Sequence, residues 1–310
     1  MTVNILFAAH ADRWATYETP LNTAFEAKGI AAHLSCDFAP ADVDYIVYAP
    51  NSPLQDFTPY TRAKAVLNLW AGVEGAVKNP TLKIPLARMV DPGMTKSMTE
   101  WVAGHVMRYH LGMDRHIVNP DQAWAPHTPP LASERGVCIL GMGALGSAVA
   151  ATLTGLGFHV NGWNRSARDV PGVTMQHGTD GLSTALKTAE ILILLLPDTP
   201  ATQNTLDAQA LAQLPKGAFV INPGRGPLID DDALLEALDQ GRVAGATLDV
   251  FRVEPLSQEH PFWAHPKVTV TPHVAAETRP VTAAEVIAEN IRRGEAGEPF
   301  LHLVDRSSGY

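Results

Sequence analysis

One stretch in the middle of the chain restricts the possible folds more than any other. Residues 137–140 are apolar and indicate a buried strand, and Gly141, Gly143 and Gly146 follow with the spacing G-x-G-x-x-G. Small and apolar residues continue to Leu153, as in a helix. In such a unit one glycine permits a tight turn, the next lets the backbone approach a pyrophosphate, and the third lets the helix pack on the strand. The spacing alone is a weak signal, but a preceding strand and a following helix are the context that a dinucleotide site requires.

Composition narrows the class of protein around this unit. The 310 residues, 46% hydrophobic and 18% charged, suit one large or two ordinary globular domains. A net charge of −9 disfavours nucleic acid and anionic membranes as partners. The longest apolar run, Ile191–Leu196, is far too short to span a membrane, and the start of the chain predicts a strand rather than a signal peptide. Cys36 and Cys138 are too few for a disulfide framework, so we expect a cytoplasmic protein.

The first 95 residues alternate short apolar runs with a helical pattern, which predicts a small parallel sheet with helices on its faces. The strands expected are Ile5–Ala9, Ile30–Leu34, Tyr45–Tyr48 and Val66–Leu69, with a helix over 14–28. Gly72 and Gly75 follow the fourth strand, where open α/β sheets bind ligands. Their backbone N–H groups could close on a carboxylate, or the segment could be an ordinary glycine turn.

A long helix is predicted over 96–117, followed by a proline-rich segment over 119–130. His105, His110 and His116 lie on this helix, but no acidic residue stands at ligand spacing, so we expect no metal site. Trp124 is either an arm that reaches another subunit or an anchor of its own loop.

The second half continues the strand–helix alternation. The strands expected are Phe158–Trp163, Ile191–Leu196, Ala218–Ile221, Ala246–Val250 and Val268–Val270, with helices over 230–240 and 281–292. The strand over 158–163 leads into Asn164-Arg165-Ser166, where NAD-binding units normally carry an acid for the ribose 2′-hydroxyl. Arg165 can instead pair with a 2′-phosphate, which favours NADP. The alternative is a solvated arginine turn.

Three ionisable residues, Arg225, Glu254 and His273, follow consecutive strands of this half. Because parallel strands end at one edge of a sheet, the three side chains can converge there. Arg225 offers a planar fork for a carboxylate, and His273 is a natural proton donor near neutral pH. Glu254, if it reaches His273, would raise the pKa of the imidazole. Each residue taken alone could instead be a surface or structural group.

These segments together resemble the D-2-hydroxyacid dehydrogenase family over essentially the whole chain. The resemblance rests on Gly141–Gly146, Asn222–Gly226, Leu248–Pro255 and Thr271–Ala276. Finer details, which resemble the family's glyoxylate and hydroxypyruvate reductases, are Asn164-Arg165-Ser166, Trp70-Ala71-Gly72-Val73 and the ending Val304-Asp305-Arg306…Gly309-Tyr310. One departure is Pro223-Gly224 before Arg225, where the family pattern has a less rigid pair.

The resemblance implies an α/β protein of two doubly wound parallel-sheet domains. A flavodoxin-like substrate domain would comprise residues 1–97 and 279–310, and a Rossmann-like NAD(P)-binding domain residues 98–278. Arg225 would hold the substrate, His273 would be the acid/base and Glu254 its partner, with substrate contacts also from Trp70, Ala71, Gly72 and Val73. The family is typically dimeric, which would bring Trp124 near the partner's active site. We expect cofactor contacts from Gly141, Met142, Gly143, Ala144, Leu145, Gly146, Trp163, Asn164, Arg165, Ser166, Leu196, Pro197, Pro223, Gly224 and Asp249.

The expected activity is NADPH-dependent reduction of small 2-oxo acids, with glyoxylate and hydroxypyruvate favoured by resemblance and NAD as a second cofactor. One alternative is an NAD-dependent dehydrogenase of bulkier D-2-hydroxy acids. Another is a non-catalytic dinucleotide sensor that regulates a partner, against which the Arg225, Glu254 and His273 set argues.

Overall fold

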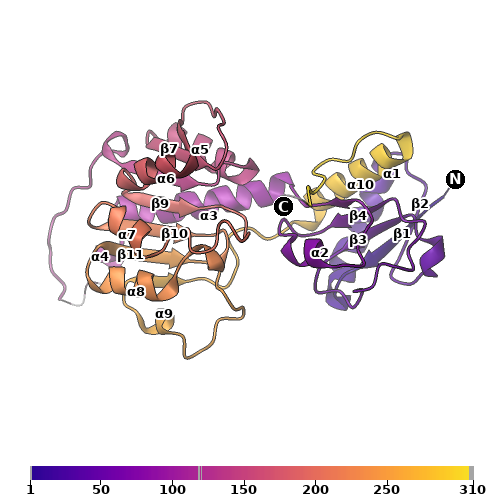
Figure 1. Cartoon of the computed structure of the whole chain (residues 1–310), viewed down its shortest axis with the longest axis horizontal. Coiled ribbons are helices and arrows are strands. Elements are labelled where there is room, and N and C mark those ends of the chain that lie inside the picture. Colours follow the sequence, from indigo (N-terminus) through magenta and orange to yellow (C-terminus); the bar gives the residue numbers. More distant parts are fainter. Residues whose placement is uncertain (1, 118, 120, 307–310) are drawn as a thin grey trace. The chain divides into compact units, whose positions relative to one another are not determined.

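The computed structural model describes residues 2–117, 119 and 121–306 (Figure 1). Gly309 and Tyr310, which contribute to the resemblance, lie outside the described residues. The chain divides into two compact units, one of residues 1–94 with 277–310 and the other of residues 95–276. The boundaries expected from the sequence are after residues 97 and 278. Within the described residues no helix is both long and apolar enough to cross a membrane.

The first unit is built on a five-stranded parallel sheet with the order β2-β1-β3-β4-β5. This is the flavodoxin-like order of doubly wound folds. Helices α1 and α10, far apart in the sequence, pack against each other in this unit (Figure 1). Its elements are β1 (Val3–Ala8), η1 (Ala11–Arg13), α1 (Trp14–Ala27), β2 (Ala32–Ser35), η2 (Pro40–Asp42), β3 (Tyr45–Tyr48), β4 (Ala65–Asn68), α2 (Glu74–Lys78), β5 (Leu86–Ala87) and α10 (Pro280–Ala296).

The second unit is built on a seven-stranded parallel sheet with the order β12-β11-β10-β9-β6-β7-β8. Six of these strands reproduce the 3-2-1-4-5-6 order of dinucleotide-binding folds, with the switch point between β6 and β9. The elements from the connecting helix onward are α3 (Pro92–His110), α4 (Asp114–Ile117), η3 (Ala132–Glu134), β6 (Gly136–Leu140), α5 (Ala144–Gly155), β7 (His159–Asn164), β8 (Thr174–His177), α6 (Gly178–Lys187), β9 (Ile191–Leu194), α7 (Ala208–Gln213), β10 (Ala218–Asn222), η4 (Gly226–Leu228), α8 (Asp231–Asp239), β11 (Val243–Leu248), α9 (Pro261–Ala264) and β12 (Val268–Val270).

Both faces of this sheet are covered, as the continuous apolar character of its strands requires. Successive side chains of a strand point to opposite faces. Cys138 and Leu140 of β6 therefore join a core cluster with α6, α7 and α8, whereas Val137 and Ile139 join a second cluster with α3 and α5. Cys138 is fully buried, and burial raises the pKa of its thiol to about 12. The doubly wound α/β fold expected from the sequence is confirmed.

Some element boundaries differ from those expected. The single helix expected over 96–117 is wrong, because α3 begins at Pro92 and ends at His110, and α4 is a separate short helix. Gly112 between them has φ +63°, a left-handed conformation that interrupts a helix. Strand β9 ends at Leu194 rather than at residue 196, and β11 ends at Leu248. Asp249 therefore lies just beyond its strand.

Candidate functional site

Each of the three glycines in the turn after β6 is required for a different structural reason. Gly141 has φ +102°, and a Cβ there would lie 2.5 Å from the carbonyl group of Leu195. A Cβ at Gly146 would collide with the carbonyl oxygen of Gly141. Gly143 is different, because a Cβ there would meet no heavy atom within 4 Å. The first and third glycines thus serve the turn and the packing of α5, and the second keeps open a space that a side chain would fill.

This open space lies at the N-terminus of α5. Gly143 is the N-cap residue and provides no side-chain hydrogen bond, and the first turn of α5 carries no acidic residue. The N–H groups at the start of a helix attract anions, phosphate above all. The turn is also held from β7, because the Met142 N–H donates to Oδ1 of Asn164 at 2.8 Å. The residues at this turn therefore fit the pyrophosphate of a dinucleotide.

The end of β7 carries no acid that would repel a further phosphate. Asn164 stands where an acid would bind the ribose 2′-hydroxyl, and its Oδ1 is engaged by the turn. Arg165 and Ser166 are exposed. In the described part of the chain the Arg165 guanidinium has no hydrogen-bond or ion-pair partner. An exposed, unengaged guanidinium fits a 2′-phosphate.

Several residues expected at the cofactor contribute their side chains to the core. Met142 is fully buried, and Trp163 and Leu196 are nearly so. The Trp163 Nε1–H donates to the carbonyl oxygen of Gly178 at 2.9 Å. By contrast, Gly143 and Ala144 at the apex of the turn are exposed. The exposed backbone of the turn, rather than these buried side chains, is what a ligand can reach in the structure.

Arg225 follows β10 in a loop that Asn222 shapes. The Asn222 Nδ2 donates to the Arg225 carbonyl oxygen at 2.9 Å, and its Oδ1 accepts from the Gly224 N–H at 3.1 Å. Arg225 Nη1 donates to the Gly224 carbonyl oxygen at 2.7 Å. Pro223 is buried, and a Cβ at Gly226 would collide with the backbone of Phe251. The loop is thus fixed on both sides of the arginine.

His273 and Glu254 come together in the loops after β12 and β11. Nδ1 of His273 lies 2.7 Å from Oε2 of Glu254, and Oε1 of Glu254 accepts from the Phe251 N–H at 2.9 Å. The hydrogen bond that His273 donates to Glu254 raises the pKa of His273, although burial opposes it. Burial would raise the pKa of Glu254, but the hydrogen bonds from His273 and from Phe251 outweigh it and lower that pKa. The pair therefore favours an imidazolium held by a carboxylate.

Asp249 makes several hydrogen bonds to the loop that carries His273. The sequence did not indicate this structural role. Its carboxylate is fully buried and accepts from Thr271 Oγ1 at 2.6 Å and from the N–H groups of Val274 and Ala275 at 2.9 Å. Its backbone oxygen accepts from the His273 N–H at 2.9 Å. His273 itself has φ +53°, which few residues other than glycine adopt. Asp249 thus anchors the loop that carries His273; an acid directly after a buried strand was the available signal.

The remaining residues singled out from the sequence lie in varied surroundings. Trp70, 42% exposed, lies in the loop between β4 and α2, and Val73 at the end of that loop is buried. His105 is half-buried with its ring 4.3 Å from that of Trp101, and burial lowers its pKa. Trp124 is 97% exposed. Within the described residues, no group of three or more metal-ligating side chains lies close enough to hold a metal ion.

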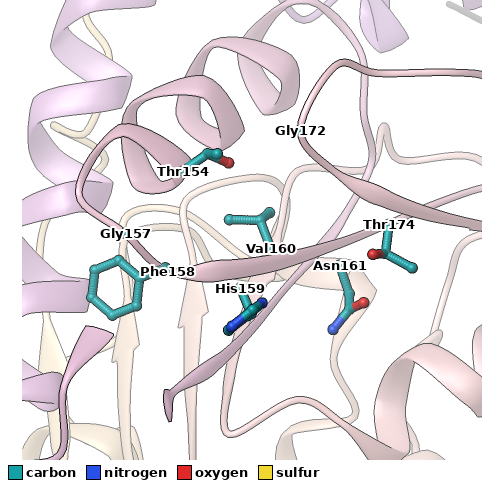
Figure 2. A pocket seen from close by; sticks show the side chains of 8 residues that line it. All are labelled: Thr154, Gly157, Phe158, His159, Val160, Asn161, Gly172 and Thr174. Carbon is teal, nitrogen blue, oxygen red and sulfur yellow. The ribbon is translucent and has the colours of Figure 1, made fainter. Parts of the chain in front are cut away.

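A hollow of about 490 Å³ lies away from these residues, beside the start of β7 (Figure 2). Thr154 from α5, His159 and Asn161 from β7, and Thr174 from β8 are among the residues that line it. None of the expected site residues lines this hollow. It faces the beginning of β7, whereas Asn164 is the last residue of that strand and Arg165 follows it.

A doubly wound sheet with an open glycine turn at its switch point defines a dinucleotide-binding protein, and the histidine–carboxylate pair beyond neighbouring strands adds an acid–base group. The chain belongs to the D-isomer-specific 2-hydroxyacid dehydrogenase family, whose NAD-binding domain matches residues 105–275. The family expected from the sequence is thereby confirmed.

Named relatives agree with this assignment. The chain is 40% identical to glyoxylate/hydroxypyruvate reductase A of Serratia proteamaculans, over 88% of this chain and 89% of that protein. A D-isomer-specific 2-hydroxyacid dehydrogenase from Xanthobacter autotrophicus Py2, solved with NADPH and MES, has a TM-score of 0.94 at 37% identity and covers 100% of both chains. An NADPH-dependent glyoxylate/hydroxypyruvate reductase from Sinorhizobium meliloti, solved with NADP and sulfate, has a TM-score of 0.85 at 34% identity and covers 100% of this chain and 99% of that one.

Proposed function

We propose that this protein is an NADPH-dependent reductase of small 2-oxo acids that converts glyoxylate to glycolate and hydroxypyruvate to glycerate. The relatives named for these substrates and for NADPH support the substrate class and the cofactor. The observation that carries the proposal is the 2.7 Å pair of His273 and Glu254, because it supplies a proton donor in a unit built to bind a dinucleotide.

The phosphates of the cofactor would be held by the exposed part of the glycine turn and by the exposed Arg165. The backbone of the glycine turn, with the start of α5, would bind the pyrophosphate. Arg165 would pair with the 2′-phosphate, and Ser166 could add a hydrogen bond. We also assign cofactor contacts to the loop segments at Leu196, Pro197, Pro223 and Gly224, and to Asp249.

The chemistry of reduction assigns a task to each residue of the site. When bound, NADPH supplies the hydride that reduces the carbonyl carbon. Arg225 binds the substrate carboxylate and polarises the carbonyl group. Since Nδ1 of His273 is engaged by Glu254, Nε2 is the atom that holds the proton for the developing alkoxide. The backbone of Trp70–Val73 contributes further N–H groups to the carboxylate.

A steady-state panel of oxo acids with both cofactors tests the proposal. We expect rapid NADPH oxidation with glyoxylate and hydroxypyruvate, slower oxidation of NADH, and weak activity on bulkier oxo acids. Efficient NADH-dependent reduction of bulky oxo acids would instead favour an NAD-dependent dehydrogenase of bulkier D-2-hydroxy acids. Tight NADPH binding without turnover of any oxo acid would instead point to a dinucleotide sensor.

We further propose that the protein is a cytoplasmic homodimer. Trp124, 97% exposed, and Ile117, 69% exposed, are large apolar side chains of the kind that a partner subunit covers. Cys36 and Cys138 are both free thiols, in keeping with a reducing compartment. Light scattering of the wild-type protein and of Trp124→Ala tests the dimer, and a monomeric wild-type protein would reject it.

A further inference from the structure

The loop between β4 and α2 has its carbonyl groups fixed from within the first unit. The Leu69 carbonyl oxygen accepts from Thr278 Oγ1 at 2.7 Å. The Trp70 carbonyl oxygen accepts from the Met89 N–H at 3.1 Å and from Asn68 Nδ2 at 2.7 Å. The same Asn68 Nδ2 also donates to the Gly72 carbonyl oxygen at 3.0 Å. A single side-chain amide thus holds two carbonyl groups of one short loop.

The burial and the amide orientation of Asn68 are both explained by its hydrogen bonds to the loop. It is the last residue of β4 and only 1% exposed. The two carbonyl acceptors fix the orientation of its amide, because the reverse orientation would set Oδ1 against them. In that orientation Oδ1 is buried with no hydrogen-bond partner among the described residues. An unsatisfied buried acceptor is costly, so the polar side chain at this position is best explained by what its two donors hold.

The fixed carbonyl groups determine where the next N–H groups point. In a trans peptide the C=O and the following N–H point in opposite directions. With the Trp70 and Gly72 carbonyl groups turned toward Asn68, the N–H groups of Ala71 and Val73 are turned away from it. The N–H groups of Ala71, Gly72 and Val73 have no acceptor within the described residues. Successive unengaged N–H groups of this kind form a binding site for an anion.

We propose that Asn68 is a positioning residue for substrate binding, which sets the Trp70–Val73 backbone so that its N–H groups bind the carboxylate of the 2-oxo acid. This inference rests on the proposed reductase function and goes beyond it, because Asn68 itself does not contact the substrate. Loss of Asn68 weakens binding of the carboxylate without touching NADPH or the proton donor. The expected signature is therefore a change in KM and not in kcat.

The test compares Asn68→Leu and Asn68→Asp with a matched control. Both variants remove the amide donors: aspartate keeps nearly the same volume, and leucine keeps the branched shape but is larger. Asn290→Leu is the control, because Asn290 is 2% exposed in α10 of the same unit and its Oδ1 accepts from the Leu301 N–H at 2.7 Å, away from the loop. The readouts are KM and kcat for glyoxylate, the Kd of NADPH, and the Kd of oxamate, an unreactive carboxylate analogue, in the presence of NADPH.

For the Asn68 variants we expect KM and the oxamate Kd to rise about 10-fold, because two hydrogen bonds that hold the loop are lost. The kcat should stay within about 3-fold of the wild-type value, and the NADPH Kd should be unchanged. The control should leave both constants near the wild-type values. A folded Asn68 variant with a wild-type KM would overturn the inference, as would an equal rise in the control or loss of the fold in both Asn68 variants. Failure of the proposed function is recognised separately, because the wild-type enzyme would then reduce no oxo acid, and the inference would fall with it.

Discussion

Replacing Glu254 with glutamine removes the charge beside His273 and keeps the size of the side chain. The hydrogen bond that His273 donates to the Glu254 carboxylate is the main cause of the raised pKa of His273, so the variant should have a lower pKa there. In the reducing direction His273 must be protonated, and a lower pKa leaves less of the acid form as the pH rises. Both enzymes are protonated at acidic pH. The ratio of wild-type to variant kcat/KM should therefore be close to one at acidic pH and increase toward alkaline pH.

The size of this effect follows from the geometry of the pair. A hydrogen bond to a charged group contributes about 1.5–3 kcal/mol when it is shielded from water. The His273 and Glu254 side chains are 53% and 34% exposed, and solvent screening reduces the interaction. We therefore expect about 1–1.4 kcal/mol, equivalent to a roughly 5–10-fold weaker proton affinity. The kcat/KM ratio should grow by about that factor between about pH 5.5 and about pH 9.

The assay is steady-state NADPH oxidation with glyoxylate across this pH range. Glu259→Gln is a suitable control, because Glu259 is an exposed acid in the same loop with no ion-pair partner among the described residues. Its profile should match the wild-type profile. If Glu254→Gln lowers kcat/KM by one constant factor at every pH, Glu254 does not act through the protonation of His273 and the reasoning is refuted.

Four further substitutions test other residues of the site. Arg165→Asp should raise the KM for NADPH by about 10-fold or more and leave NADH turnover nearly unchanged, and an unaltered cofactor preference would remove Arg165 from the phosphate site. Gly146→Ala should lower the free energy of unfolding by about 1–3 kcal/mol, whereas Gly143→Ala should keep stability and weaken NADPH binding, as calorimetry and thermal unfolding can show. Asp249→Asn should cost about 1–3 kcal/mol of stability and lower kcat by releasing the His273 loop, and a stable variant with full kcat would contradict the anchoring role.

Much of the fold could be predicted because buried parallel strands are continuous apolar runs. The strands expected at Tyr45–Tyr48 and Val268–Val270 coincide with β3 and β12. Strand β8, Thr174–His177, was missed because it is polar and partly exposed at the edge of its sheet. The two residues of β5 are too few to form a pattern. Apolar runs thus revealed most of the strands, but not a polar edge strand or a strand of two residues.

The residue types of the candidate site could be chosen from the sequence, but most of the contacts between them could not. Arg225, Glu254 and His273 stood out because they follow consecutive strands, which end at one edge of the sheet. The role of Asp249 depends on a loop that returns to it from more than twenty residues away, which no local pattern contains. Asn68 gave only a weak signal, a polar residue at the end of an apolar run, because its function lies in the path of the loop that it holds.

The central claim is that His273 supplies the proton in a dinucleotide-dependent reduction of small oxo acids. The most direct test is His273→Asn, since asparagine tolerates the left-handed backbone conformation at this position. The measurements are kcat for glyoxylate reduction and the Kd of NADPH in the same preparation. Because His273 supplies the proton, we expect a loss of about 10²–10⁴-fold in kcat with an unchanged NADPH Kd. Near-normal turnover in the variant would contradict it.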